Sequence, residues 1–197
     1  MPTGVALRDV REQLFAAAER VLLRDGPGAL TSRAVTTEAG VAKGVLHKHF
    51  ADFDAFLAEL VHERAAQIGR LETALRDSAG TGSVAGHLAD ALIDVFGPVG
   101  LSIVGLITFR DGLRARLRRT WPTGIPVLTE AAAAIASYLA AERDRGRLAP
   151  DADVDTLALT LVGTGHLLFS GRDGTPPETE AVRGYVTSVL GGALREA

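Results

Sequence analysis

The chain has 197 residues, of which 47% are hydrophobic and 23% charged, so it fits one large domain or two small ones and is too apolar to be disordered. It has no cysteine, which excludes disulfide frameworks, cysteine zinc sites, thiol nucleophiles and iron–sulfur clusters. The net charge is −3, yet both lysines, Lys43 and Lys48, lie beside His47 and His49, and this basic cluster suggests a polyanion site.

The pattern of the first 50 residues predicts one long helix followed by two short ones. Apolar residues recur every three or four positions before Asp25, and the glycines and proline at 26–28 are expected to end this helix. Two short helices should follow at about 31–39 and 42–49, and Gly40 gives the backbone freedom to turn between them. Neither short helix is stable alone, so both should pack onto the first one. The expected core of this part is formed by Leu14, Ala18, Val21, Ala34, Val35, Ala39, Val41, Leu46 and Phe50.

The rest of the chain is also predicted to be helical. A long helix should begin near Asp52 and end within residues 77–82. No alternation with a period of two occurs beside hairpin turns, so no strand is expected and the predicted fold class is all-α. The most apolar stretch, Leu92–Phe109, contains Asp94 and Gly97-Pro98, so we expect a buried helix there and no membrane segment. The later helices are expected at about 83–96, 98–119 with a break near Asp111-Gly112, 124–145, 153–170 and 177–196.

The second short helix is expected to present a small cationic face. Lysine and imidazole can reach phosphates or base acceptors, Gly44 allows close approach of the backbone, and Val45 could contact a thymine methyl. A helix that enters the major groove of DNA needs such a face. The periodicity alone is also compatible with a generic helical hairpin that has an exposed polar face. The outward residues are expected to be Lys43, Gly44, Val45, His47 and Lys48.

A set of twelve residues in and around these two short helices forms a recognisable sequence motif: Gly26, Gly28, Leu30, Thr31, Ala39, Gly40, Val41, Lys43, Gly44, Leu46, Phe50 and Leu57. With this set, the segment resembles the DNA-binding domain of TetR-family transcriptional regulators. The resemblance implies a helix-turn-helix DNA-binding domain at residues 1–50, called the head below, and a helical ligand-binding and dimerisation domain at residues 51–197. The candidate DNA-binding residues are Thr31, Ser32, Arg33, Ala42, Lys43, Gly44, Val45, His47, Lys48 and His49.

Four positions depart from the residues that are common in this family. The family commonly has serine at position 42, threonine at 45, tyrosine at 47 and lysine at 53, where this chain has Ala42, Val45, His47 and Phe53. The tyrosine and the lysine typically contact phosphates in the family. His47 can still donate a hydrogen bond to a phosphate, whereas Phe53 cannot.

The resemblance further implies a homodimer, formed through the last two helices, and a small-molecule inducer in the C-terminal domain. The expected ligand is mostly hydrophobic because the candidate lining is apolar. The candidate ligand-binding residues are Phe96, Leu101, Phe109, Trp121, Leu128, Leu161 and His166. The apolar faces expected to form the dimer carry Leu157, Leu161, Leu168, Val182, Val186, Val189 and Leu190.

Catalytic and metal-binding patterns are not evident. His47 and His49 are two positions apart on a helix and point to different sides, so no metal site or cofactor is expected. No nucleophile elbow or cofactor fingerprint occurs, so the chain is not expected to be an enzyme. We expect a cytoplasmic DNA-binding transcriptional regulator, a repressor that a small ligand releases from a palindromic operator. The alternatives are a helical small-molecule-binding module without DNA function and an all-α enzyme, and the cationic face argues against both.

Overall fold

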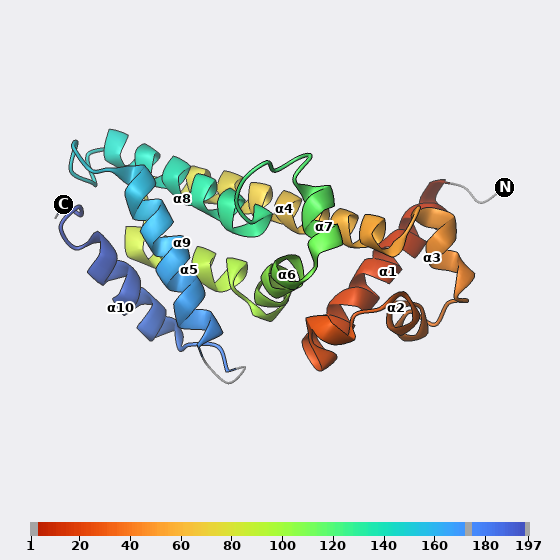
Figure 1. Cartoon of the computed structure of the whole chain (residues 1–197). Helices are drawn as coiled ribbons and strands as arrows, with labels where there is room; N and C mark the ends of the chain where they lie inside the picture. The colour runs from red at the N-terminus through yellow and green to blue at the C-terminus, as the bar shows by residue number, and fades with distance from the viewer. Residues whose placement is uncertain (1–3, 172–174, 196–197) are drawn as a thin grey trace. The chain divides into compact units, whose positions relative to one another are not determined.

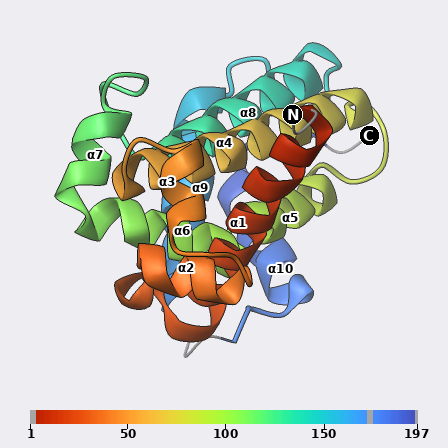
Figure 2. The same cartoon turned by 90° about the vertical axis from the view of Figure 1, so that its right-hand side faces the viewer.

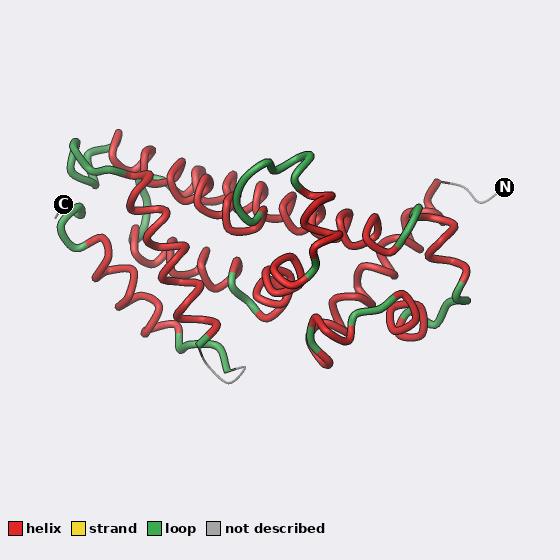
Figure 3. The backbone as a smooth tube through the Cα atoms, viewed as in Figure 1, coloured by secondary structure: helices red, strands yellow, loops and turns green. Residues whose placement is uncertain are grey.

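The computed structural model describes residues 4–171 and 175–195, and the regular elements in these ranges are helices (Figure 1). In the same ranges, no segment is drawn as a strand (Figure 3), and the one pairing of extended backbone is an isolated bridge between Leu148 and Leu194. The predicted all-α fold class is confirmed. The helices are α1 (Gly4–Asp25), the short 3₁₀ helix η1 (Pro27–Ala29), α2 (Ser32–Glu38), α3 (Gly44–His49), α4 (Phe53–Ser78), α5 (Val84–Val95), α6 (Pro98–Phe109), α7 (Asp111–Leu117), α8 (Pro126–Asp144), α9 (Val154–Ser170) and α10 (Thr179–Leu190).

The structure confirms one expected helix break and shortens the last expected helix. The helix expected at 98–119 is divided into α6 and α7 at Arg110, whose backbone is extended and which precedes the expected break at Asp111-Gly112. The last helix ends at Leu190 instead of near residue 196, because Gly191 and Gly192 favour helix poorly. The chain beyond them pairs with the segment after α8, where Ala149 N–H donates to the Ala193 carbonyl at 2.8 Å.

The chain forms two compact units. Unit 1 comprises residues 1–63 and 102–123, and unit 2 comprises residues 64–101 and 124–197. The head therefore belongs to a larger unit that also contains the first part of α4, most of α6 and the whole of α7. Helices α4 and α6 each contribute residues to both units.

In unit 1, helices α1, α2 and α3 lie together in both views (Figure 1, Figure 2). Thr31 begins α2 as its N-cap, and its hydroxyl accepts a hydrogen bond from Ala34 N at 3.1 Å. Gly40 has φ 66°, a left-handed conformation that suits glycine at the corner between α2 and α3. Leu14, Val35 and Leu46 are fully buried between the three helices, as the sequence pattern predicts. The other buried residues expected here, Ala18, Val21, Ala39 and Phe50, are also in the core, and Ala34 and Val41 are half-buried.

In unit 2, the main helix pairs are α8 with α9 and α5 with α10. A buried polar network holds the turn between α4 and α5 against α8. Glu142 on α8 is completely buried, and its carboxylate accepts from Gly80 N at 3.1 Å and pairs with Arg147 Nη1 at 3.2 Å. Arg147 also donates to the carbonyls of Thr81 and Gly82, at 2.8 and 2.6 Å. The network thus joins three segments that are far apart in sequence.

The same network contains the buried Tyr138, one turn before Glu142 on α8. Its hydroxyl lies 2.9 Å from His87 Nδ1 on α5. Burial, followed by the neighbouring Glu142 carboxylate, raises the pKa of Tyr138 well above its usual range. The phenol therefore stays protonated and can serve as a hydrogen-bond donor inside the unit.

Among the described helices, none is by itself long and apolar enough to cross a membrane. Helices α5 and α6 pass such a test of length and composition only as a pair, and the chain bends by 57° between them. This pair includes the apolar stretch Leu92–Phe109.

Candidate nucleic-acid interface

Helix α3 has one buried side and one exposed side. Leu46 is buried against the head's core, whereas Lys43, His47 and Lys48 are exposed. No atom outside the local backbone lies within 4 Å of a Cβ built on Gly44, so the backbone there is open to a close approach. Of the candidate DNA-binding residues, Thr31, Arg33 and Ala42 are also exposed, and Ser32, Val45 and His49 are half-buried. All ten residues therefore keep some access to solvent, although the hydroxyl oxygen of Ser32 is itself buried.

The exposed side of α3 carries the positive charges of Lys43 and Lys48, and the glutamate at the end of the preceding helix has other partners. Glu38, at the end of α2, accepts from Arg20 Nε and Arg24 Nη1 of α1, both at 2.7 Å. These hydrogen bonds, from Arg20 first and then Arg24, hold the pKa of Glu38 below its ordinary value. Among the described side chains, no carboxylate forms an ion pair with Lys43 or Lys48. The exposed side of α3 can therefore attract phosphates without internal competition.

The comparisons with known proteins identify this part of the chain. The model of bacterial regulatory proteins of the tetR family matches residues 14–60, which include α2, α3 and the first turns of α4. Residues 14–60 form a TetR-family domain. A comparison with the sequences of curated proteins gave no significant match.

Solved structures share the fold over almost the whole chain, and two of the following three are described as TetR-family proteins. A protein from Mesorhizobium loti described as a TetR-family transcriptional regulator has 17% identity and a TM-score of 0.69, with 95% of this chain and 98% of that chain covered. A TetR-family member from Streptomyces coelicolor has 25% identity and a TM-score of 0.62, with 91% and 96% covered. The multidrug binding protein EbrR complexed with malachite green has 24% identity and a TM-score of 0.62, with 91% and 96% covered.

The candidate ligand-binding residues do not come together in one unit. Phe109 and Trp121 belong to unit 1, and the other five belong to unit 2. Phe109 is 87% exposed, and the Trp121 ring lies 4.7 Å from the His62 ring, near the end of α7. In unit 2, the rings of Phe96 and His166 are 5.9 Å apart. Of the remaining three, Leu161 is buried, and Leu101 and Leu128 are half-buried.

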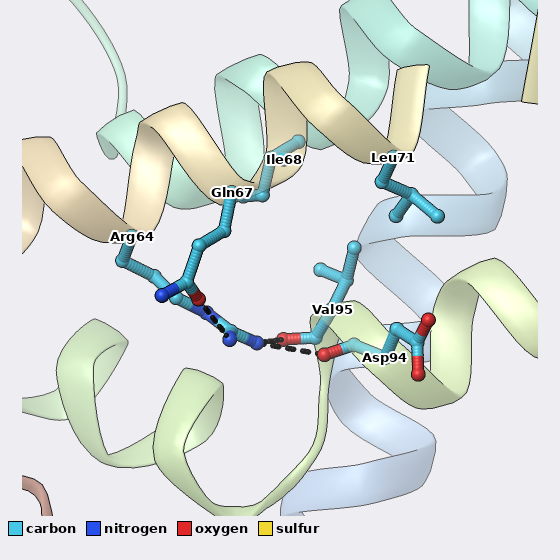
Figure 4. A pocket seen from close by; sticks show the side chains of 6 residues that line it. All are labelled: Arg64, Gln67, Ile68, Leu71, Asp94 and Val95. Atoms are coloured by element: carbon cyan, nitrogen blue, oxygen red, sulfur yellow. Dashed lines mark hydrogen bonds between the residues drawn. The ribbon is translucent and has the colours of Figure 1, made fainter. Parts of the chain in front are cut away.

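A cavity of about 240 Å³ in unit 2 is lined by other residues, from α4 and the end of α5 (Figure 4). Arg64 Nη2 donates to the Asp94 carbonyl at 2.7 Å, and Arg64 Nη1 donates to Gln67 Oε1 at 2.9 Å. The apolar part of the lining is formed by Ile68, Leu71 and Val95. The sequence analysis missed this cavity, because Arg64, Gln67 and Asp94 have the spacing of ordinary polar surface residues.

The exposed apolar residues of α9 differ from those expected at the dimer interface. Leu159 is 65% exposed and Leu167 is 70% exposed, and both lie on one face of α9 with Gly163 between them. The expectation that the surface is formed by Leu161 is wrong, because this side chain is completely buried in its own chain. Val182, Val186 and Leu190 of α10 are likewise buried within the chain, and Leu157, Leu168 and Val189 are half-buried.

Proposed function

We propose that the protein is a transcriptional regulator that binds operator DNA through the exposed side of α3. The observation that carries the proposal is the unpaired positive charge of Lys43 and Lys48 on the second short helix of a TetR-family domain. A helix of this kind enters the major groove, where side chains at its exposed face contact base edges and phosphates. A protein that binds bacterial chromosomal DNA acts in the cytoplasm. We infer repression, because a head bound at an operator obstructs transcription from it.

The salt dependence of DNA binding tests this proposal. Each head exposes three cations on α2 and α3, namely Arg33, Lys43 and Lys48, so two heads would neutralise roughly six phosphates and give a slope of log K against log[salt] of about −5. The DNA is the region that flanks the protein's own gene. The double variant Lys43→Glu, Lys48→Glu should abolish binding, whereas Arg76→Glu, a control in unit 2, should leave it unchanged. Normal binding by a folded double variant would refute the assignment.

We further propose that two copies pair through α9 and α10. The exposed Leu159 and Leu167, separated by Gly163, form an apolar strip that a second copy would cover. A two-fold dimer presents its two heads about 34–36 Å apart, one turn of DNA, and therefore reads a palindrome. The proposed interface lies on the same two helices that are expected from the sequence to form the dimer. It is formed, however, by Leu159 and Leu167 instead of Leu161.

We propose the cavity between α4 and α5 as the site of a small-molecule inducer. The EbrR complex, which has the same fold, supports a small-molecule ligand for this chain. The lining combines the Arg64 guanidinium and the Gln67 amide with Ile68, Leu71 and Val95. We therefore infer an amphipathic ligand with a hydrogen-bond acceptor, which is more polar than the ligand expected from the sequence. Filling the cavity with Leu71→Trp should leave DNA binding intact and abolish the response to the inducer.

A further inference from the structure

The first turn of α4 carries two carboxylates, and it follows the recognition helix α3 almost directly. Asp52 begins the helix, because its Oδ1 accepts a hydrogen bond from Ala55 N at 2.6 Å. Asp54 lies in the first turn of α4, and Phe53 lies between the two aspartates in the sequence. This turn therefore joins α3 to the rest of unit 1, and whatever holds it also limits the movement of α3.

Two arginines from the α7 region hold this turn. Arg116 Nη2 pairs with Asp52 Oδ2 at 2.7 Å, and Arg110 Nε pairs with Asp54 Oδ1 at 2.9 Å. The Arg110 guanidinium also lies over the Phe53 ring, 5.0 Å from its centroid. All five residues belong to unit 1, and Figure 1 shows α7 beside the beginning of α4. We call these five residues the α4–α7 clasp.

The backbone of α7 is adapted to this contact. A Cβ built on Gly112 would overlap the Asp54 carboxylate, so only glycine lets α7 approach the turn this closely without displacing that side chain. The backbone N–H of Ala55, and after it the Arg116 guanidinium, hold the pKa of Asp52 below its ordinary value. Asp52 is therefore ionised at neutral pH, and its pairing with Arg116 persists there.

A cluster of phenylalanine rings connects the clasp with the head. The Phe53 and Phe56 rings are stacked at 5.7 Å, and the Phe56 ring meets the Phe50 ring edge-on at 5.0 Å. Phe50 is the residue that ends α3. Phe56 also stacks on Phe15 of α1 at 5.5 Å. A continuous series of packed side chains thus runs from Arg110 to the end of the recognition helix.

We propose that Arg110 and Arg116 are positioning residues for DNA binding, which hold α3 in its binding pose from outside the head without contacting DNA. The proposal rests on the proposed function, since it concerns the affinity of that same surface. It also gives Phe53 a role: the ring is a platform for the Arg110 guanidinium. A ligand-dependent displacement of the α7 region would then weaken DNA binding through the clasp.

Charge reversal at Asp54 separates positioning from a direct phosphate contact. Asp54→Arg removes a negative charge and adds a positive one, so a purely electrostatic effect on DNA would tighten binding. Positioning has the opposite sign: Asp54→Arg and Arg110→Asp should each weaken operator binding, by about tenfold for a dimer that loses an exposed pair in each head. The double variant Asp54→Arg, Arg110→Asp restores the pair and should recover most of the affinity.

Arg116 and Arg114 form a matched pair of substitutions on α7. Arg116→Gln breaks the contact with Asp52, whereas Arg114 pairs with Asp111 of the same helix, so Arg114→Gln leaves the clasp intact. We expect about tenfold weaker binding for Arg116→Gln, a salt slope equal to that of the unmodified protein, and no change for Arg114→Gln. Melting curves identify any variant that is unfolded, and Arg116→Lys should retain part of the affinity.

The measurements are fluorescence anisotropy titrations with the operator duplex at several salt concentrations. Tighter binding by Asp54→Arg would show that the clasp acts through the charge of the surface, and would overturn the proposal. The same holds if the slope of log K against log[salt] becomes smaller by about two for a dimer that carries Arg116→Gln in both heads, because Arg116 would then contact phosphate directly. Unchanged affinity in all clasp variants would also overturn the proposal. If the unmodified protein itself shows no salt-dependent binding to any DNA, the proposed function has failed. This outcome is distinct from a failure of the clasp proposal, in which the unmodified protein binds DNA and the clasp variants bind it equally well or more tightly.

Discussion

Replacing Glu142 with alanine should destabilise unit 2 by about 3 kcal/mol. Breaking a buried ion pair by removing one partner costs about 3–5 kcal/mol, because it leaves the other charge without compensation. The Arg147 side chain is 25% exposed, so water can partly replace the lost carboxylate, and the lower end of that range applies. The loss of the acceptor for Gly80 N–H adds to the cost.

Two further variants separate the charge from the packing. Glu142→Gln keeps the volume and one acceptor oxygen, so its cost should be smaller, at about 1.5 kcal/mol. The double variant Glu142→Ala, Arg147→Ala should be less destabilised than the sum of its parts, because no charge is left unpaired. Urea unfolding followed by far-ultraviolet circular dichroism measures these free energies. A cost below about 1 kcal/mol for Glu142→Ala would refute the reasoning, because removing a completely buried carboxylate that holds Arg147 and Gly80 N–H leaves both of them without it.

Other predictions concern the head and the α9 surface. Because the pKa of Glu38 is lowered in the folded head, its ion pairs stabilise the protein above its ordinary pKa of 4.5 and are lost as the pH falls through the lowered value. Melting temperatures of Glu38→Gln should therefore fall less on acidification than those of the unmodified protein. Leu159→Glu should give a folded monomer in light scattering, because this side chain is exposed. Leu161→Glu should instead unfold unit 2, because this side chain is completely buried. Identical behaviour of the two variants would contradict the assigned exposed and buried faces of α9. Val45→Ala should change the operator sequence that is preferred in a selection from random DNA. It should leave the salt dependence of binding nearly unchanged, because it alters an apolar contact and not a charge.

The sequence predicts the elements well where a helix has one apolar side. The exposed side of α3 could be assigned because Leu46 and Phe50 mark its buried side and leave Lys43 and Lys48 outside. Helix α9 shows the limit of this argument, since Leu159 and Leu161 are both leucines and only the packing of the neighbouring helices decides which of them is buried. Periodicity finds an apolar face, but it cannot tell which neighbour covers it.

The sequence does not predict contacts between residues that are far apart in the chain, for a different reason. Asp52 and Arg116 are 64 positions apart, and each has the spacing of an ordinary solvated residue until the fold brings them to 2.7 Å. The candidate ligand-binding residues are mostly large apolar side chains, and the sequence does not show which of these are buried; Phe109 is 87% exposed. Residues that combine polar and apolar roles at a cavity, such as Arg64 and Gln67, leave no periodic signal in one chain.

Trp121 makes the α7 region visible to optical spectroscopy. It is the only tryptophan of the chain. Its backbone N–H donates a hydrogen bond to the Leu117 carbonyl at the end of α7, at 2.9 Å, and its ring lies 4.7 Å from the His62 ring on α4. Its emission therefore reports on α7 and α4 together, with no background from other tryptophans. A movement of α7 away from α4 separates the two rings, and stopped-flow fluorescence of the unlabelled protein can record its rate.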